Sequence, residues 1–235
     1  MLDKSTYRAL KQEISILESG EEIQEIPSDF LRFTPHPYQK LGAPYGKESP
    51  FFLRREVLRL LLFAQERLHS LKRGYRLKIF DAYRPLSVQK FMIEYDTDRV
   101  SLDIFGTAFK ELSNANSLEV QRVVSHFWSP ISDRVELSPP PHSTGGALDL
   151  TIVDKNGIEL DMGTKIDELI DASASDYYEH SQTLYQKNRE LLVEVMSDAG
   201  FTQLPTEWWH FSYGDQIWAL DKTEDAKYGI YIKSV

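Results

Sequence analysis

The stretch "PPPHSTGGALDLTI", residues 139–152, constrains the fold of this chain more than any other part of the sequence. Three consecutive prolines fix the backbone immediately before His142, which limits the freedom of that side chain before any partner binds. Two glycines follow and let the chain bend back without side-chain obstruction. The next residues alternate and predict a strand with two faces, Ala147, Asp149 and Thr151 on one, and Leu148, Leu150 and Ile152 on the other. We expect the leucine face to pack a core and Asp149 to project from a polar face.

A second stretch, "TEWWHFSY" at residues 206–213, places Glu207 three residues before His210 with two tryptophans between them. Aromatic side chains can wall a dry pocket, in which the pKa of a carboxylate rises and the field of a metal ion is poorly screened. Residues three apart in an extended backbone point to opposite faces. We therefore expect Glu207 in the loop that leads into a strand, or at a bulge.

Each stretch alone has a simpler interpretation, either a surface turn beside a structural aspartate or an aromatic strand with an exposed glutamate. Together they predict a metal site. His142, Asp149 and His210 would supply three ligands and leave one position open for water, which is the arrangement of a catalytic zinc ion. Glu207 is then available as the general base that takes a proton from this water.

Arg84, in "FDAYRP", directly follows a predicted strand and is held by Pro85. A guanidinium at this position could face the site and stabilise the oxyanion of a tetrahedral intermediate. The alternative is an ordinary salt bridge with Asp81, and the sequence leaves both interpretations open.

The composition excludes several classes of protein. The 235 residues contain no cysteine, which rules out a disulfide scaffold, a thiolate zinc site and a catalytic thiol. A net charge of −9 argues against a general nucleic-acid binder. The N-terminus lacks the pattern of a signal peptide, and the apolar runs are too short to span a bilayer. We therefore expect a soluble, cytoplasmic protein with no membrane partner.

The periodicity of apolar residues predicts one α+β domain over residues 1–235, with a small antiparallel sheet and flanking helices around the zinc site. Helices are expected at 57–71, 84–95 with Ser87 as cap, 117–128 with Asn116 as cap, and 182–199. Strands are expected at 75–83 and 147–152, and then in "FTQL", "EWWHFSY" and "QIWAL". Residues 1–26 predict a weak amphipathic helix, and residues 27–50 an irregular loop or cover.

Five motifs, "DAYRP", "HSTGGALDLT", "LDMGTKID", "NRELLVEVMSDAGF" and "EWWHF", resemble in order and spacing those of the VanX-type zinc D-alanyl-D-alanine dipeptidases. The resemblance implies a compact α+β fold, one Zn²⁺ per chain and hydrolysis of the small dipeptide D-Ala-D-Ala, a peptidoglycan precursor. It also implies roles for six residues: His142, Asp149 and His210 as zinc ligands, Glu207 as the catalytic base, Arg84 as the transition-state arginine, and Asp167 as the acid near the free amino group of the substrate.

Two features depart from the family pattern. Pro140 stands where the family usually has a serine that lines the substrate pocket, so the dipeptide preference is open. Residues 1–45 do not align, and both Tyr38 and Tyr45 are candidates for a pocket tyrosine. The remaining histidines, 36, 69, 126 and 180, are interpreted as surface or core residues, with His180 the one to compare with a structure.

Three alternative functions are weighed against the dipeptidase. A D,D- or L,D-carboxypeptidase acting on peptidoglycan stems would need export and an open groove. An Fe(II) oxygenase generally places its carboxylate two residues after the first histidine, whereas here the separation is seven, and it gives Glu207 no task. A non-catalytic zinc-binding module would need neither Glu207 nor Arg84. The oligomeric state and the physiological role are left open.

Overall fold

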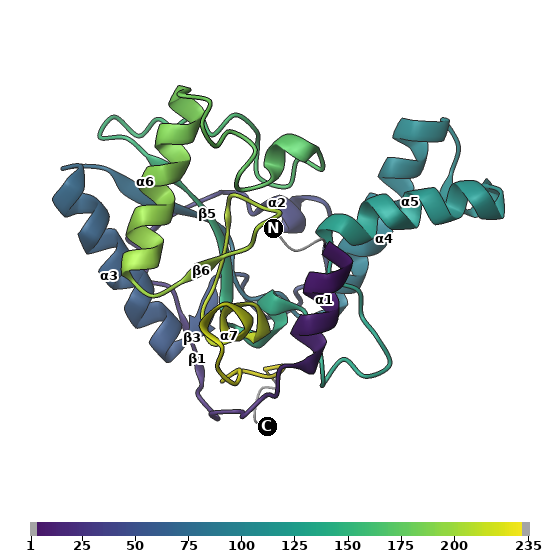
Figure 1. The fold of residues 1–235 in the computed structure, drawn as a ribbon, viewed down its shortest axis with the longest axis horizontal. Helices are drawn as coiled ribbons and strands as arrows, with labels where there is room; N and C mark the ends of the chain where they lie inside the picture. Colours follow the sequence, from purple (N-terminus) through teal and green to yellow (C-terminus); the bar gives the residue numbers. More distant parts are fainter. Residues whose placement is uncertain (1–3, 232–235) are drawn as a thin grey trace.

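The structure, a computed structural model, describes residues 4–231, with side chains described from residue 9 onward (Figure 1). Its centre is a five-stranded sheet of order β2 (Leu31–Arg32), β4 (Arg76–Asp81), β5 (Ala147–Val153), β7 (His210–Ser212) and β6 (Thr202–Gln203). The β2–β4 pair is parallel, and the other pairs are antiparallel. The predicted α+β class is confirmed. Residues 1–3 and 232–235 of the predicted 1–235 domain lie outside the described residues.

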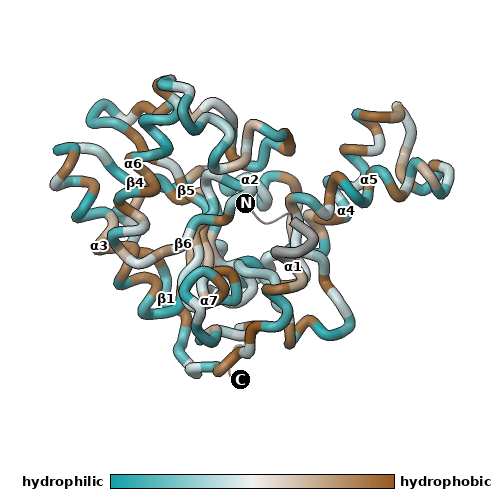
Figure 2. Tube along the Cα trace, in the orientation of Figure 1, coloured by the Kyte–Doolittle hydropathy of each residue, from teal (hydrophilic) through white to brown (hydrophobic). Residues whose placement is uncertain are grey.

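Two helices cover one face of this sheet, α3 (Arg55–Leu71) and α6 (Leu184–Asp198) (Figure 1). Both were predicted from apolar residues at helical spacing, and Figure 2 shows these residues recurring along the two helices. Leu148, Leu150 and Ile152 pack against them in the main core, as expected from the alternation in β5. A short second sheet, β1 (Ile23–Glu25) with β3 (Phe52–Arg54), lies beside α3.

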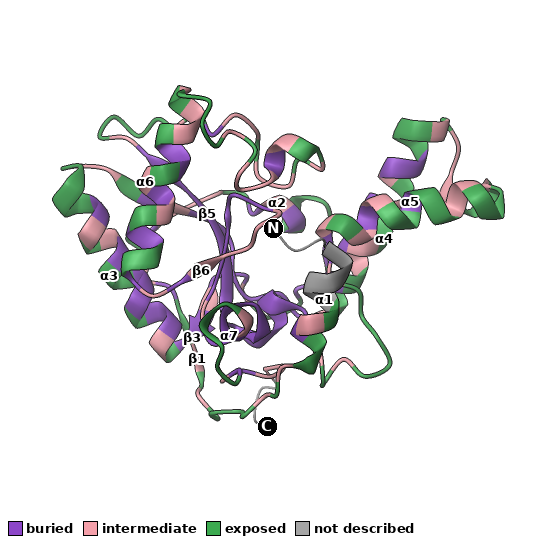
Figure 3. Ribbon diagram, in the orientation of Figure 1, coloured by how far each residue is buried: buried purple, intermediate pink, exposed green. Residues whose placement is uncertain are grey.

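A helical hairpin projects from the opposite side of the molecule, built from α4 (Leu86–Phe105) and α5 (Asn114–Phe127), with a short 3-10 turn (Phe109–Glu111) between them. Its root packs in a second core that includes Tyr38, Phe80, Val88 and Trp128. Figure 3 shows that burial is concentrated in the sheet and its covering helices, whereas the outer part of the hairpin is largely exposed. The root of the hairpin is therefore the part that borders the centre of the molecule.

The two ends of the described chain run side by side. The helix α1 (Lys4–Glu13) lies next to α7 (Gln216–Lys222), and Leu17 N–H donates to the carbonyl of Ala226 at 2.7 Å. Ile14 and Ile16 pack on a small third core of Trp218, Ala219 and Ala226. The weakly predicted N-terminal helix is thus present and is anchored to the C-terminal part of the chain.

Some local predictions are wrong. "QIWAL" forms the helix α7 rather than a strand, because Asp215 caps it by accepting hydrogen bonds from Ile217 N and Trp218 N, each at 2.9 Å. The helix α5 is capped by Ser113 and not by Asn116, and Ser87 lies inside α4, which begins after Pro85. Residues 27–50 contain β2 and the short helix α2 (Pro37–Lys40) and are otherwise irregular, as predicted. Among residues 4–231, no helix has the length and apolar character needed to cross a membrane.

A bulge in β4 arranges polar residues in one row across the sheet. Ile79 pairs with Leu150, but the next pair is Asp81 with Asp149, so Phe80 is the extra residue. Asp149 in turn pairs with His210 on β7. Paired residues of antiparallel strands point to the same face, so Asp81, Asp149 and His210 lie next to one another on the face opposite to α3 and α6. Asp149 thus projects from a polar face opposite to the leucines, as predicted, and this face is buried as well, because all seven residues of β5 are buried.

Candidate active site

His142, Asp149 and His210 converge on one point, as predicted. Asp149 and His210 are neighbours through the β5–β7 register, and His142 comes from a 3-10 turn, Pro141–Thr144, that follows the proline run. Nε2 of His142 lies 3.3 Å from Asp149 Oδ2, and Nδ1 of His210 lies 3.1 Å from Asp149 Oδ1. The two histidine nitrogens are 3.1 Å apart, and all three side chains are buried.

Hydrogen bonds on the far side of each imidazole determine which nitrogen faces this point. Nδ1 of His142 lies 2.7 Å from the carbonyl of Ala82, which can only accept, so Nδ1 carries the proton. Nε2 of His210 lies 3.2 Å from Ser212 Oγ, whose hydroxyl already donates to Asp215 at 2.7 Å, so Nε2 donates to Ser212. The inner nitrogens therefore present lone pairs. Two imidazole lone pairs and a carboxylate facing one another are a donor set that fits a divalent cation such as zinc.

The electrostatics of the site keep both of its central aspartates ionised. Burial alone would raise the pKa of Asp149, but when protons occupy the inner nitrogens in place of a cation, the charge of His142 and the hydrogen bonds from both histidines hold that pKa well below its usual range. Asp81 is also buried, and Arg84, His36 and His142 lower its pKa in spite of that burial. Asp149 is thus a carboxylate ready to bind a cation.

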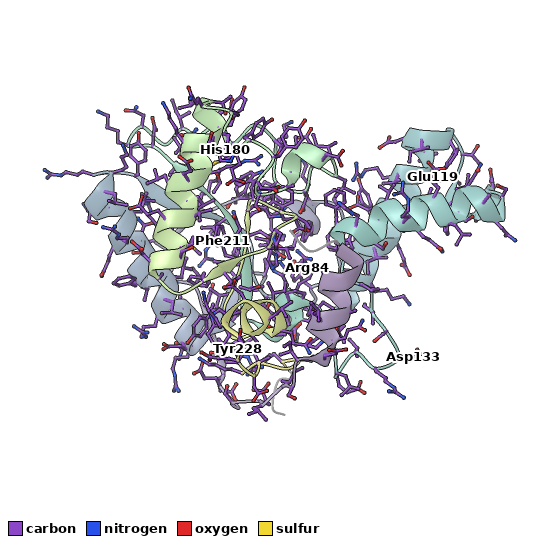
Figure 4. The ribbon with its side chains drawn as sticks, in the orientation of Figure 1. Arg84, Glu119, Asp133, His180, Phe211 and Tyr228 are labelled. Carbon is purple, nitrogen blue, oxygen red and sulfur yellow. The ribbon has the colours of Figure 1, made fainter. Side chains whose placement is uncertain are left out.

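Arg84 lies beside the three converging side chains and is almost fully buried (Figure 4). Its Nε donates to Asp81 at 2.9 Å, and its Nη2 lies 3.5 Å from Asp149 Oδ2. The guanidinium also sits over the rings of Tyr38 and Trp128, at 4.9 and 4.8 Å from their centroids. The salt bridge with Asp81 and the position at the site, which the sequence offered as alternatives, therefore occur together.

The backbone around Arg84 is tied to the turn that carries His142. Arg84 N–H donates to the carbonyl of His142 at 3.2 Å, and Ser143 Oγ donates to the carbonyl of Arg84 at 2.8 Å. These two bonds join segments that are about sixty residues apart in the sequence. The position of the guanidinium relative to His142 is thus fixed by backbone contacts.

Asp167 joins the same network through a tyrosine. Tyr38 donates to Asp167 Oδ2 at 2.6 Å and accepts from Arg84 Nη2 at 3.1 Å. Burial and the nearby charge of Asp149 raise the pKa of Asp167 to about 8, although Tyr38 and Arg84 act in the opposite direction. Of the two tyrosines that the sequence could not distinguish, Tyr38 contacts Asp167, whereas Tyr45 donates to Asp81 at 3.0 Å.

Glu207 lies in the turn before β7, as the spacing predicted, and is buried with its Oε2 3.9 Å from His210 Nδ1. It lines a pocket of about 290 Å³ together with all the other predicted site residues. Further walls come from the root of the helical hairpin, from the end of α1 and from the loop before Glu207, including Trp128, Lys11 and Leu204. Trp209 lines this pocket, but Trp208 turns away and donates to Thr164 at 2.8 Å.

Sequence reasoning missed several members of the site. His36 bonds to Asp81 at 3.1 Å, Gln89 accepts from Arg84 Nη1 at 3.0 Å, and His126 lines the pocket. No local sequence pattern indicates these residues, because tertiary packing brings each of them to the site. His180, the histidine singled out for comparison, lies at the periphery with its side chain 88% exposed (Figure 4).

Residues 32–228 match peptidase family M15, described as D-Ala-D-Ala dipeptidase. The chain belongs to this family. The family predicted from the five motifs is thus confirmed, as is the class of enzyme, a hydrolase of the metallopeptidase type.

Members of the family from three bacteria resemble the chain to different degrees. A D-alanyl-D-alanine dipeptidase of Synechocystis sp. is 38% identical over 88% of this chain and 87% of its own length. The D-alanyl-D-alanine dipeptidase of Escherichia coli (strain K12) is 43% identical over 30% of the chain and 36% of its own length. That of Enterococcus faecalis is 24% identical over 66% of the chain and 71% of its own length.

Among solved structures, that of the LdcB LD-carboxypeptidase aligns with 89% of this chain and 77% of its own, at 14% identity and a TM-score of 0.44.

Proposed function

We propose that this chain is a zinc-dependent dipeptidase that hydrolyses D-Ala-D-Ala. The observation that carries the proposal is the convergence of two imidazole lone pairs and the Asp149 carboxylate in a pocket that also holds Glu207, Arg84 and Asp167. The names of the relatives agree with this substrate. A pocket of about 290 Å³ suits a ligand of dipeptide size.

His142, Asp149 and His210 would hold the zinc ion. Their inner atoms are unprotonated, and their outer atoms are fixed by Ala82 and Ser212, so the set is organised before the metal binds. When bound, zinc supplies a Lewis acid that polarises the scissile carbonyl. The metal-binding residues and the catalytic residues are then separate groups that can be tested separately.

The side chains of the chain itself divide the remaining work. Glu207 takes a proton from the attacking water and returns it to the amine of the departing D-alanine. The guanidinium of Arg84, held by Asp81 and Gln89, stabilises the negative charge that develops on the carbonyl oxygen. Asp167 binds the free ammonium group of the substrate, and its contact with Tyr38 fixes its orientation.

We propose that the chain acts as a single unit, with the described part of residues 1–45 forming a cover over the pocket. Two contacts support this role. Lys11 of α1 lines the pocket, and Tyr38 bonds to both Arg84 and Asp167. The N-terminal segment therefore contributes to the walls of the site both through Lys11, which precedes the family match, and through Tyr38, which lies within it.

The test is release of D-alanine from D-Ala-D-Ala by the purified, zinc-loaded protein, with L-Ala-L-Ala and an N-acylated D-Ala-D-Ala measured in parallel. We expect release from the free D,D-dipeptide alone, because Asp167 requires a free ammonium group. Release from the acylated compound alone would identify a carboxypeptidase instead, and the absence of all release would contradict the proposal.

Two variants separate the base from the metal ligands in the same assay. Glu207→Gln should lower kcat by about 100- to 10,000-fold while one zinc remains bound per chain. His142→Ala should lose the zinc itself, measured by atomic absorption after gel filtration. Full activity in the first variant, or a full zinc content in the second, would remove the corresponding role.

A further inference from the structure

A buried lysine from the N-terminal helix reaches the wall of the pocket. Lys11 lies in the last turn of α1, it is 8% exposed, and it lines the pocket together with Arg84, Asp167 and Glu207. Its Nζ lies 3.3 Å from the carbonyl oxygen of Pro139, 128 residues away in the sequence. The ammonium group is thus beside the proline run that leads into His142.

The position of this lysine is fixed by the end of the helix that carries it. Gln216 of α7 donates to the carbonyl of Ile14 at 2.8 Å and to the carbonyl of Leu137 at 2.9 Å. Ile14 also packs on the core formed by Trp218 and Ala219. The end of α1 and the loop before the proline run are therefore attached to the same buried side chain, which holds Lys11 against the wall.

The charges that line the pocket can be matched to the two ends of a dipeptide. Among the described residues of the lining, Lys11 and Arg84 carry a permanent positive charge. Arg84 is engaged by Asp81, Gln89 and Tyr38, and it lies next to Asp149. A free dipeptide carries an ammonium group at one end and a carboxylate at the other, and Asp167 matches the ammonium end.

The proline run next to Lys11 offers no backbone donor to a carboxylate. Residues 139–141 are prolines, so none of them has a backbone N–H to donate. A carboxylate in a buried pocket needs charged or N–H donors to offset its loss of hydration. The Lys11 ammonium, which can donate three hydrogen bonds, is placed to provide them.

We propose that Lys11 binds the free carboxylate of the substrate and so restricts the enzyme to peptides that end with the residue directly after the scissile bond. The inference rests on the proposed dipeptidase function and adds the group that recognises the C-terminal end of the substrate. Asp167 and Lys11 then bind the two charged ends of the dipeptide, and hydrolysis of the peptide bond takes place between them.

The experiment compares D-Ala-D-Ala with its C-terminal carboxamide, using zinc-loaded protein and measuring kcat and KM for each. The wild type should prefer the acid by at least about tenfold in kcat/KM. Lys11→Met, which keeps the length of the side chain and removes the charge, should raise KM for the acid about 10- to 100-fold with kcat changed less than about threefold. KM for the carboxamide should change less than about twofold, and Lys11→Arg should restore most of the preference.

The ratio of the kcat/KM values for the two substrates, measured on one variant, does not depend on how much of that protein is folded. A partly destabilised variant therefore still tests the proposal. Lys90→Met is the matched control, because it removes one charge from an exposed site on α4. If the acid-to-carboxamide ratio of kcat/KM in Lys11→Met equals that of the wild type, so that kcat/KM falls equally on both substrates or on neither, the role of Lys11 is overturned and the dipeptidase proposal stands. A wild type that cleaves acid and amide equally well would have the same consequence. A wild type that fails to cleave D-Ala-D-Ala would overturn both.

Discussion

Asp149 and Asp167 are two carboxylates in one pocket whose neighbours drive their pKa values in opposite directions. Asp149 is surrounded by His142, His210 and Arg84, which keep it ionised in spite of complete burial. Asp167 has one hydroxyl donor, Tyr38, and experiences the negative charge of Asp149, so its pKa rises. Such a divergence is typical of sites in which two acids have different tasks, and it supports the proposed division into metal binding by Asp149 and recognition of an ammonium group by Asp167.

The raised pKa of Asp167 predicts how stability depends on pH. The folded pKa is about 8, whereas an unfolded aspartate has a pKa of about 3.9. Between these values the folded protein holds a proton that the unfolded chain releases. The free energy of unfolding of the metal-free protein should therefore fall as pH rises through this window, by at most about 1.4 kcal/mol per pH unit from this group.

Urea unfolding of Asp167→Asn, in the presence of a chelator and between pH 5 and 8, measures this contribution. The free energy of unfolding of the variant should depend less steeply on pH than that of the wild type, and the variant should be more stable than the wild type at pH 8. Asp133→Asn, at an exposed loop position, is the control and should leave the slope unchanged. Equal slopes in the wild type and in Asp167→Asn would show that Asp167 does not hold the proton.

At the scale of elements, the turn that carries His142 depends on a left-handed glycine. Gly145 ends the 3-10 turn with φ +73°, and a Cβ at this position would lie 2.9 Å from Ile23 Cγ2 of the neighbouring strand β1. Gly157 has a similar φ of +82° in an exposed turn, where a Cβ would meet no atom of the described residues within 4 Å. The two glycines thus share a backbone conformation and differ in crowding.

Gly157→Ala should lower the free energy of unfolding by about 1 kcal/mol, which is the cost of the left-handed conformation alone. Gly145→Ala should lower it by about 2–4 kcal/mol, because crowding adds to that cost. Because the turn positions His142, Gly145→Ala should also weaken zinc binding, measured by competition with a chelating dye. Equal losses of stability in the two variants would show that crowding at Gly145 has no effect.

The elements also show what could be predicted from the sequence and what could not. Spacing and polarity identified the three converging side chains, because a buried aspartate in an apolar strand is costly without a partner. "QIWAL" is too short for its periodicity to distinguish a strand from a helix. The helix is favoured by the hydrogen bonds that the Asp215 side chain accepts at its N-terminus. The bulge at Phe80, which brings Asp81 next to Asp149, is not predicted by the residue pattern.

For the molecule as a whole, Arg54 connects three distant parts of the chain. Its Nε donates to the carbonyl of Thr144 at 2.7 Å, its Nη groups contact Glu18, and its Nη2 donates to the carbonyl of Gly229 at 3.3 Å. Its backbone N–H also donates to the carbonyl of Gly145 at 2.9 Å. The N-terminal segment, the turn of His142 and the C-terminal segment therefore meet at one buried guanidinium, which no local pattern predicted.

Arg54→Met should lower the free energy of unfolding by about 3–5 kcal/mol, because it leaves buried acceptors without a donor. Arg54→Lys should not restore the loss, since one ammonium group cannot reproduce the fork of donors. The matched control is Arg59→Met on α3, which removes a guanidinium from an exposed pair with Glu56 and should leave the stability close to that of the wild type. Urea unfolding measures all three, and wild-type stability in Arg54→Lys would contradict the assignment.

The row of Asp81, Asp149 and His210 across three strands has a consequence for how such a protein can diverge. These residues are neighbours through the register of the sheet, so the lengths of the segments that join the strands do not enter their mutual geometry. Those segments, which include the α4–α5 hairpin and the loop with Asp167 and Leu169, supply walls of the pocket. Insertions and deletions in these segments can therefore reshape the pocket walls over generations while the row of Asp81, Asp149 and His210 is inherited unchanged with the sheet.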